Sequence, residues 1–244
     1  MDPPLLELAG LSCSTDSGQL FSDLDLSIND GDIIVLQGRS GTGKTTLLKC
    51  ISHLIQHEGT VRFRGSTARD IGMPFYRTKV LYVPQRPSLL PGSPSTFLKT
   101  VLSLGSQNQR LKEDHNPGDL VNEKMVRYRS IGITNEWSIE PELWERDWSN
   151  LSGGEAQRML LAIALALNTA EVLLLDEPTS ALDEETSLAV EKFLVEEVGS
   201  PRTSVKAILW ITHSAEQGRR IGTRFARLSG GKCLEGSRSP SLSV

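Results

Sequence analysis

A glycine-rich segment near the N-terminus, GRSGTGKT at residues 38–45, constrains the fold more than any other feature of the chain. The apolar run DIIVLQ precedes it, and the residues KTTLLKCI that follow have helical spacing of their apolar positions. A strand, a glycine-rich turn and a helix in this order form a loop whose backbone N–H groups converge on a phosphate, at the positive end of the helix. The segment therefore predicts an α/β protein with a nucleotide phosphate site.

The residue types in this loop predict the contacts that a nucleotide would make. We expect Lys44 to reach the β- and γ-phosphates, Thr45 to place its hydroxyl on Mg²⁺, and Thr46 to lie against the α-phosphate. The structural alternative is a flexible surface turn, and the strand and helix on either side argue against it. The candidate phosphate-binding residues are Gly38, Arg39, Ser40, Gly41, Thr42, Gly43, Lys44, Thr45 and Thr46.

Later segments continue the α/β pattern. The apolar run VLLLD at residues 172–176 suits a strand that is buried on both faces, and AILWIT at residues 207–212 predicts another. Between them, SLAVEKFLVEEV has the spacing of an amphipathic helix. A strand, a helix and a strand in this order predict right-handed parallel crossovers in a layered α/β core.

Three regions depart from this pattern. Near the N-terminus, LLELAGLS and DLDLSI are short and alternating, which favours an antiparallel side sheet. Residues from about 86 to 149 combine polar stretches with helix-like segments that contain Trp137, Trp144 and Trp148, which indicates a mostly helical insertion. The final segment GGKCLEGSRSPSLSV is rich in serine and glycine, and we expect residues 235–244 to form a disordered tail.

Composition excludes several classes of protein. No apolar run approaches the roughly 18 residues of a membrane span, and the start MDPPLLEL lacks the features of a signal peptide. Cys13, Cys50 and Cys233 show no metal-ligand spacing, so we expect reduced thiols. A formal net charge of −4 argues against a nucleic-acid partner.

An acidic pair and a histidine follow two of the expected strands. Asp176 ends the run VLLLD, at the edge where parallel α/β sheets bind ligands, and we expect it to hold Mg²⁺ through water. Glu177 comes next and is suited to polarise an attacking water. Such a pair is more often a helix cap, but the phosphate loop in the same chain reverses that preference. For the same reason His213, directly after AILWIT, is a candidate γ-phosphate contact.

The segment LSGGEAQR at residues 151–158 is an unusual start for a helix. The residues MLLAIALAL after it form helices readily, yet two glycines occupy the first turn, where each costs about 1 kcal/mol relative to alanine. Ser152 is a good N-cap, and Glu155 three residues later completes a capping box. A helix N-terminus without side chains leaves exposed N–H groups, which makes it a good anion site.

The ordered set GRSGTGKT, YVPQ with Gln85, LSGGEAQR, VLLLDEP, SALD and His213 resembles the nucleotide-binding subunit of an ATP-binding-cassette (ABC) transporter. The resemblance covers residues from about 5 to 234, and LSGGEAQR is its most specific motif. It implies one ABC ATPase domain at residues 1–234, with a phosphate-loop NTPase core. That core is a mostly parallel, RecA-like sheet flanked by helices at residues 1–85 and 150–234, and the helical insertion at about 86–149 interrupts it.

The resemblance also assigns roles to residues. Glu177, His213 and Gln85 would be catalytic, and Thr45, Gln85 and Asp176 would surround Mg²⁺. Gln85 would also link the core to the insertion. Asp183 would lie on a loop that crosses a dimer interface. Two cassettes would face each other head to tail, as a homodimer or heterodimer, so that one subunit's signature meets the γ-phosphate held by the other. The signature residues are Ser152, Gly153 and Gly154.

The implied function is ATP hydrolysis that closes the dimer and powers transport through separate membrane-spanning subunits, with the chain at the cytoplasmic face of the membrane. A helix of a membrane subunit would dock near Gln85, where apolar residues either form an exposed patch or pack internally. These residues are Phe75, Tyr76, Leu89, Leu90 and Phe97. A soluble non-transport cassette ATPase and a nucleotide-sensing clamp with little turnover are the alternatives. The segments QRPSLLPGSPSTFL and AILWITHS show a narrower resemblance to small cassettes of metal-export and metal-tolerance transporters.

One departure from the family bears on base recognition. An aromatic residue usually stacks on the adenine from the N-terminal region, whereas SCSTDSGQ here has none and Phe21 lies several residues later. Loss of such a stack costs about 1–3 kcal/mol, so we expect weaker or less base-selective ATP binding. Ser214 stands where an acidic residue is common, which is a smaller departure.

Overall fold

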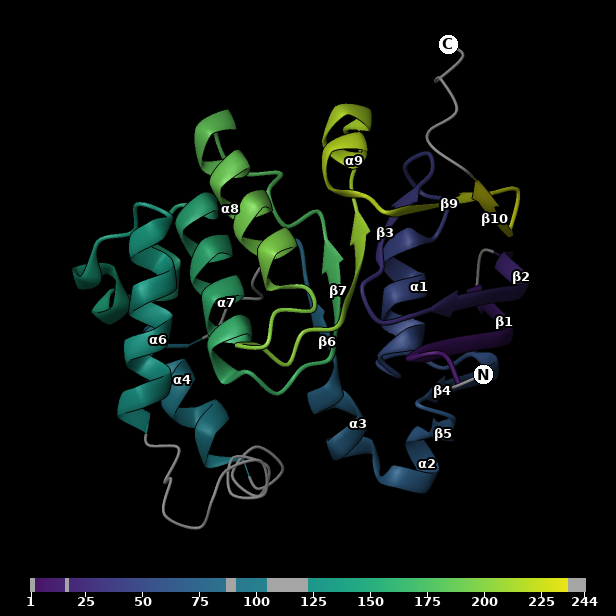
Figure 1. The fold of residues 1–244 in the computed structure, drawn as a ribbon, viewed down its shortest axis with the longest axis horizontal. Helices are drawn as coiled ribbons and strands as arrows, with labels where there is room; N and C mark the ends of the chain where they lie inside the picture. The colour runs from purple at the N-terminus through teal and green to yellow at the C-terminus, as the bar shows by residue number, and fades with distance from the viewer. Residues whose placement is uncertain (1–2, 16–17, 87–90, 105–122, 237–244) are drawn as a thin grey trace. The chain divides into compact units, whose positions relative to one another are not determined.

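The computed structural model describes residues 3–15, 18–86, 91–104 and 123–236 (Figure 1). By its internal packing the chain divides into two units. We name residues 1–82, 171–177 and 195–244 the core unit, and residues 83–170 and 178–194 the helical unit. Among the described residues, no helix combines the length and the apolar character that crossing a membrane requires.

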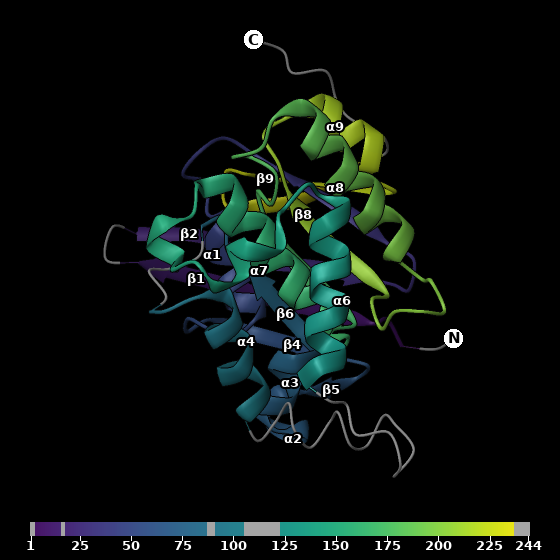
Figure 2. The same ribbon diagram turned by 90° about the vertical axis from the view of Figure 1, so that its left-hand side faces the viewer.

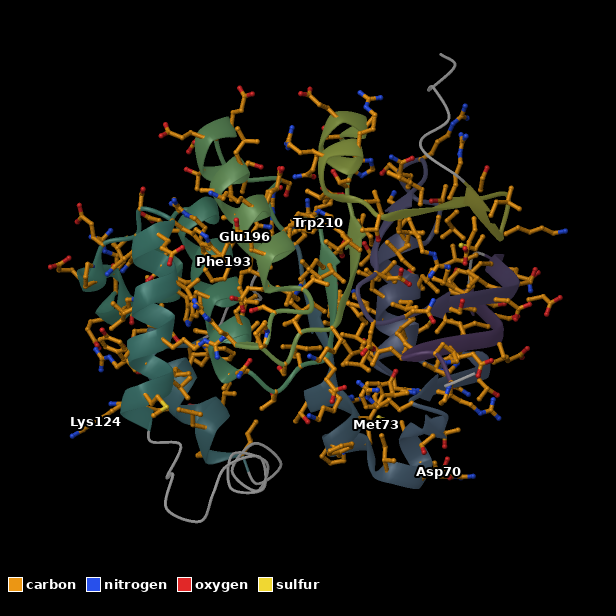
Figure 3. All side chains as sticks on the ribbon, viewed as in Figure 1. Asp70, Met73, Lys124, Phe193, Glu196 and Trp210 are labelled. Atoms are coloured by element: carbon orange, nitrogen blue, oxygen red, sulfur yellow. The ribbon has the colours of Figure 1, made fainter. Side chains whose placement is uncertain are left out.

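The main sheet of the core unit has the strand order β10-β9-β3-β8-β7-β6. Its strands are β3 (Ile33–Gln37), β6 (Val80–Val83), β7 (Val172–Asp176), β8 (Ala207–Ile211), β9 (Arg224–Ser229) and β10 (Lys232–Gly236). Neighbours from β9 to β7 run parallel, and β10 pairs with β9 in the antiparallel sense. Every residue of β7 and β8, including Trp210 (Figure 3), is buried, which confirms two strands covered on both faces.

Helix α1 (Lys44–Ile51) follows β3 through the glycine-rich loop. Its apolar side chains Leu47, Leu48 and Ile51 are buried in the same cluster as Leu174 of β7 and Leu209 of β8. The helix therefore covers one face of the sheet, and its first turn is held at the edge where β3 ends. This arrangement confirms the strand, loop and helix expected from the sequence.

An antiparallel side sheet completes the core unit beside α1 (Figure 1). Its strand order is β2-β1-β4-β5, with β1 (Leu6–Thr15), β2 (Gly18–Ile28), β4 (Glu58–Phe63) and β5 (Ser66–Thr67). Leu6, Leu8 and Leu11 of β1 turn into the shared core, which confirms the alternating pattern. The short helices of this unit are α2 (Ala68–Ile71), which carries Asp70, α3 (Met73–Lys79), which begins at Met73 (Figure 3), and α9 (Ala215–Ile221).

The helical unit is built on α4 (Pro94–Ser103), α6 (Glu123–Glu136), α7 (Gly153–Leu167) and most of α8 (Glu184–Glu197). Helices α6 and α7 lie side by side in both views (Figures 1 and 2). The helical unit therefore includes α7 and most of α8, which follow the expected insertion in the sequence. The 3₁₀ turns η1 (Pro141–Glu145) and η2 (Trp148–Asn150) connect them.

Three tryptophans fill the interior of the helical unit. Trp144 is fully buried, and its Nε1 donates a hydrogen bond to Oγ1 of Thr134 at 3.2 Å. The ring of Trp137 meets Phe193 of α8 (Figure 3) edge-on at 5.4 Å, and Trp148 meets Phe97 of α4 in the same way at 5.9 Å. The tryptophans of the expected insertion therefore act as packing residues.

The last described strand extends further than the sequence predicts for ordered structure, and the three cysteines are free thiols. Strand β10 includes Glu235 and Gly236, which the sequence assigned to a disordered tail, and residues 237–244 lie outside the described part. Cys13 and Cys50 are buried free thiols, and Cys233 is a partly exposed one. Burial raises the pKa of the Cys50 thiol to about 12 and that of Cys233 to about 11, which makes both poor nucleophiles.

Candidate functional site

The loop between β3 and α1 has the backbone of an anion site. Gly43 takes φ 95° at the N-cap of α1, in the left-handed region that glycine enters without steric cost. Because Gly43 has no side chain to cap the first N–H groups of α1, these donors remain for a ligand. Arg39, Ser40, Gly41 and Thr45 are exposed around this helix start.

Lys44 closes over the loop. The residue is 6% exposed, and its Nζ donates hydrogen bonds to the backbone oxygens of Gly38 at 2.9 Å and Arg39 at 3.0 Å. Burial lowers the pKa of the Lys44 ammonium, while the charges of Glu177 and Asp176 act in the opposite direction. The structure thus places one ammonium and two carboxylates together in the core unit.

Asp176 is the last residue of β7 and is 4% exposed. Its Oδ2 accepts a hydrogen bond from the phenol of Tyr82 at 3.1 Å, across the neighbouring strand β6. Burial, followed by the charge of Asp176, raises the pKa of Tyr82, so the phenol keeps its proton. Sequence reasoning missed Tyr82, although it stands in the quoted motif YVPQ.

Glu177 and His213 meet at the ends of β7 and β8. Nε2 of His213 lies 2.9 Å from Oε1 of Glu177, with the two side chains 51% and 20% exposed. The backbone N–H of Glu177 donates to the oxygen of Ile211 at 3.1 Å, which links the two strand ends. Glu177 has φ 49°, an uncommon value for a residue with a side chain and one that recurs at functional sites. The core unit therefore brings Lys44, Asp176, Glu177 and His213 together.

Gln85 belongs to the helical unit. Its Nε2 donates to Oγ of Ser180 at 3.3 Å, and its backbone oxygen accepts from Nε2 of Gln157 at 3.0 Å. Gln157 lies in the signature LSGGEAQR, so hydrogen bonds within this unit connect Gln85 to the helix that the signature begins. Gln157 is a second residue that the sequence did not single out.

The signature forms the expected helix start. Helix α7 begins at Gly153 with Ser152 as N-cap. Oγ of Ser152 accepts from the N–H of Glu155 at 3.2 Å, and Oε2 of Glu155 accepts from the N–H of Ser152 at 2.7 Å. These two bonds confirm the capping box. Ser152 and Gly153 are exposed, so the remaining N–H groups of the first turn are open to an anion.

The two glycines of this turn have different surroundings. A Cβ atom on Gly154 would lie 2.9 Å from the backbone oxygen of Ala181 and 3.1 Å from Cδ2 of Leu182, whereas one on Gly153 would meet only the Cβ of Ala181 at 3.7 Å. Gly154 is therefore required by packing within its own unit, a reason that the sequence did not reveal. Asp183 likewise has a local role, since its carboxylate accepts two hydrogen bonds from Thr186 in the first turn of α8, at 2.9 Å each.

The expectation of an exposed apolar docking patch is wrong for Tyr76. That residue is fully buried, and its hydroxyl donates to the backbone oxygen of Ile51 at 2.7 Å. Phe75 and Phe97 are partly buried, and Leu89 and Leu90 lie outside the described residues.

Phe21 does not supply a platform for a nucleotide base. It is fully buried in the core, opposite Cys13 in the side sheet, and its Cδ1 lies 3.5 Å from the position of a Cβ on Gly43. The ring therefore packs beneath the phosphate loop.

Comparison with known proteins identifies the family. The model of the ABC transporter family matches residues 21–180. The phosphate import ATP-binding protein PstB 1 of Vibrio cholerae is 30% identical over 246 residues, covering 97% of this chain and 84% of that protein. The aliphatic sulfonates import ATP-binding protein SsuB 3 of Rhodococcus jostii is 34% identical over 230 residues, covering 94% and 73%.

Solved structures share the fold. The dimeric post-hydrolysis state of the ATP-binding cassette MJ0796 bound to ADP and Pi superposes with a TM-score of 0.77 at 24% identity, covering 96% of this chain and 99% of that one. The cassette cbiO1 of Clostridium perfringens, part of the complex cbiONQ, gives 0.72 at 21% identity, covering 97% and 89%. The names of the curated relatives do not support the narrower resemblance to metal-export cassettes. The chain belongs to the ABC transporter family and is an ATP-binding cassette subunit, an ABC-type ATPase.

Proposed function

We propose that the chain binds Mg-ATP at the loop of residues 38–46 and hydrolyses it with Glu177 as the general base and His213 at the γ-phosphate. The observation that carries this proposal is the convergence of Lys44, Asp176, Glu177 and His213 at the ends of β3, β7 and β8. Ligands of parallel α/β sheets bind at this edge.

The residues present fit a magnesium ion. Mg²⁺ prefers oxygen ligands and is usually held by one or two protein side chains plus phosphates and waters. Within the core unit, the buried carboxylate of Asp176 and the hydroxyl of the exposed residue Thr45 supply such oxygens. When bound, Mg²⁺ neutralises charge on the β- and γ-phosphates.

Each side chain of the core unit then has a task. Lys44 keeps its ammonium at the loop, where the phosphates offer stronger acceptors than the carbonyl oxygens of Gly38 and Arg39. The carboxylate of Glu177 takes the proton of the attacking water. His213 contacts the same carboxylate through Nε2 and so holds it in one orientation.

The signature completes the site from a second cassette. Because Oγ of Ser152 already accepts the N–H of Glu155, its hydroxyl proton is left to donate to a phosphate oxygen. The first-turn N–H groups of the exposed Gly153 and the partly buried Gly154 are further donors. A head-to-tail dimer, homomeric or heteromeric, places this anion site over the γ-phosphate bound by the partner. The dimeric state described for MJ0796 with ADP and Pi supports this assembly.

We assign the cassette to an importer at the cytoplasmic face of a membrane, with separate membrane-spanning subunits. Relatives named as phosphate, aliphatic sulfonate and anion import ATP-binding proteins support this assignment. A soluble non-transport ATPase and a nucleotide-sensing clamp are the competing functions.

One experiment separates the three functions. The tagged chain is purified from detergent-solubilised membranes of its own cells, and ATP hydrolysis is measured with and without EDTA. Co-purification of membrane-spanning proteins together with EDTA-sensitive turnover is the expected result. Turnover without such partners favours the soluble ATPase, and ATP binding without turnover favours the clamp.

A further inference from the structure

Tyr82 has no role in the proposed function, although its hydroxyl donates a hydrogen bond to Asp176. Asp176 is nearly enclosed, at 4% exposure, and its Oδ2 accepts from the phenol of Tyr82 at 3.1 Å. Among the residues that the structure describes, no other side chain hydrogen-bonds this carboxylate. Tyr82 therefore satisfies one of its two oxygens, and Oδ1 receives no hydrogen bond from the described protein.

The geometry points to a positioning role. Tyr82 and Asp176 stand on adjacent strands of one sheet, β6 and β7, so the rigid ladder fixes the distance between them. A hydrogen bond to one oxygen stops the carboxylate from rotating about its terminal torsion, which is otherwise soft. Groups that hydrogen-bond a metal-ligating carboxylate typically change metal affinity by 10–100-fold when removed.

We propose that Tyr82 is a positioning residue of the magnesium site: its phenol holds Oδ2 of Asp176 so that Oδ1 is presented to the metal of the bound nucleotide. This inference rests on the proposed function, because it takes the carboxylate of Asp176 as the group that holds the metal, through water as the sequence predicts. The alternative is that Tyr82 merely fills space, since its ring also packs against the apolar cluster of the core unit.

The substitution Tyr82→Phe separates the two roles, because it removes the hydroxyl and keeps the ring. The probe is Mn²⁺, whose binding to the full-length chain with ADP is followed by electron paramagnetic resonance. We expect the Mn²⁺ dissociation constant to rise about tenfold. The affinity for ADP in EDTA should stay unchanged, and the Mg²⁺ concentration for half-maximal ATPase should rise with little loss at saturation.

Tyr76→Phe is the matched control. Tyr76 is a second buried tyrosine of the core unit, and its hydroxyl donates to the backbone oxygen of Ile51. Its loss should lower the unfolding midpoint and leave Mn²⁺ affinity unchanged. Tyr82→Met tests packing further: it should weaken Mn²⁺ binding as much as Tyr82→Phe does. An effect in Tyr82→Met alone would show that the ring, not the hydroxyl, matters.

Two results would overturn the inference in different ways. Wild-type Mn²⁺ affinity in Tyr82→Phe would remove the positioning role while leaving the proposed function intact. Wild-type Mn²⁺ affinity in Asp176→Asn would instead show that Asp176 does not hold the metal, and this part of the proposed function would fail with it.

Discussion

Nε2 of His213 lies 2.9 Å from Oε1 of Glu177, and the backbone fixes both residues at the ends of adjacent parallel strands. Asp176 pairs with Ile211 in the register of β7 and β8, and the N–H of Glu177 extends this pairing by donating to Ile211. Strand β7 ends at Asp176, and Glu177 directly after it has the uncommon φ of 49°. The carboxylate is therefore positioned by the sheet edge as well as by the imidazole.

Glu177→Gln should abolish hydrolysis and preserve nucleotide binding. The amide keeps the shape of the side chain but accepts no proton from water, and general-base catalysis typically contributes 10²–10⁴-fold. ATPase turnover should fall at least 100-fold, and size-exclusion chromatography with ATP should show a stable dimer that retains unhydrolysed ATP.

Glu185→Gln serves as the control for this variant, since Glu185 is an exposed residue in the first turn of α8. It should retain wild-type turnover. If Glu177→Gln keeps more than about a tenth of the wild-type rate, Glu177 is not the base.

The stability of the chain should fall on acidification because of His53. Burial, followed by the charges of His57 and Arg77, lowers the pKa of His53 from 6.5 to about 4. Between these two pH values the unfolded chain binds a proton that the folded chain does not, so the free energy of unfolding decreases as pH falls through this window. Below about pH 4 this contribution levels off.

Urea unfolding of His53→Asn at pH 7, 6 and 5 tests this dependence. His53 has φ 53°, and asparagine tolerates that conformation better than most residues. The variant should lose less stability than the wild type between pH 7 and pH 5. Parallel curves for the two proteins would show that His53 does not cause the acid sensitivity.

Most of the fold was predictable because its signals are local. VLLLD and AILWIT read as buried strands, and the structure places both in the middle of the parallel sheet. The capping box of Ser152 and Glu155 was predictable for the same reason, since it depends on residues three apart. The environment of Tyr76 was not predictable, because a partly apolar stretch does not indicate which of its residues hydrogen-bonds the distant Ile51.

The candidate site shows the same division. Four site residues were predictable from their positions in the glycine-rich loop or at the ends of strands. They are Lys44, Asp176, Glu177 and His213. Tyr82 and the packing of Gly154 against Ala181 depend on side-chain contacts between segments far apart in sequence. No periodicity or spacing encodes such contacts.

The two signature glycines should respond in opposite directions to alanine. Gly153→Ala adds a Cβ at an ordinary contact distance of 3.7 Å and should stabilise the helix by up to about 1 kcal/mol. Gly154→Ala forces a Cβ to within 2.9 Å of a backbone oxygen, and overpacking of this kind costs about 1–3 kcal/mol. Thermal unfolding measures both. Equal shifts of the unfolding midpoint in the two variants would mean that Ala181 moves away from residue 154 at no cost in free energy.

Gly153→Asp tests the composite site without disturbing the fold. An aspartate in the first turn of α7 is favourable to the helix dipole by about 0.3–1 kcal/mol, so the unfolding midpoint should stay equal or rise. In the proposed dimer the same carboxylate faces a γ-phosphate, where like charges repel strongly. Stability and ATPase activity should therefore change independently. The Gly153→Asp variant should be at least as stable as the wild type and nearly inactive.

Mixing this variant with Lys44→Ala tests whether each ATP lies between two chains. Lys44→Ala removes the ammonium at the loop. In the proposed dimer, each variant alone should inactivate both sites of a homodimer. In a mixed dimer, one site carries both defects, and the other joins an intact loop to an intact signature. Because random mixing makes about half of the dimers mixed, roughly a quarter of wild-type ATPase should return if the sites act independently.

Cooperation between the sites would lower this recovery, and weak dimerisation could remove it, so the single variant decides the question. Gly153→Asp is suited to that role because its Cβ meets only the Cβ of Ala181, at the ordinary contact distance of 3.7 Å, so the fold accommodates the new side chain. If Gly153→Asp hydrolyses ATP at the wild-type rate, the signature does not touch the nucleotide, and the head-to-tail dimer is wrong.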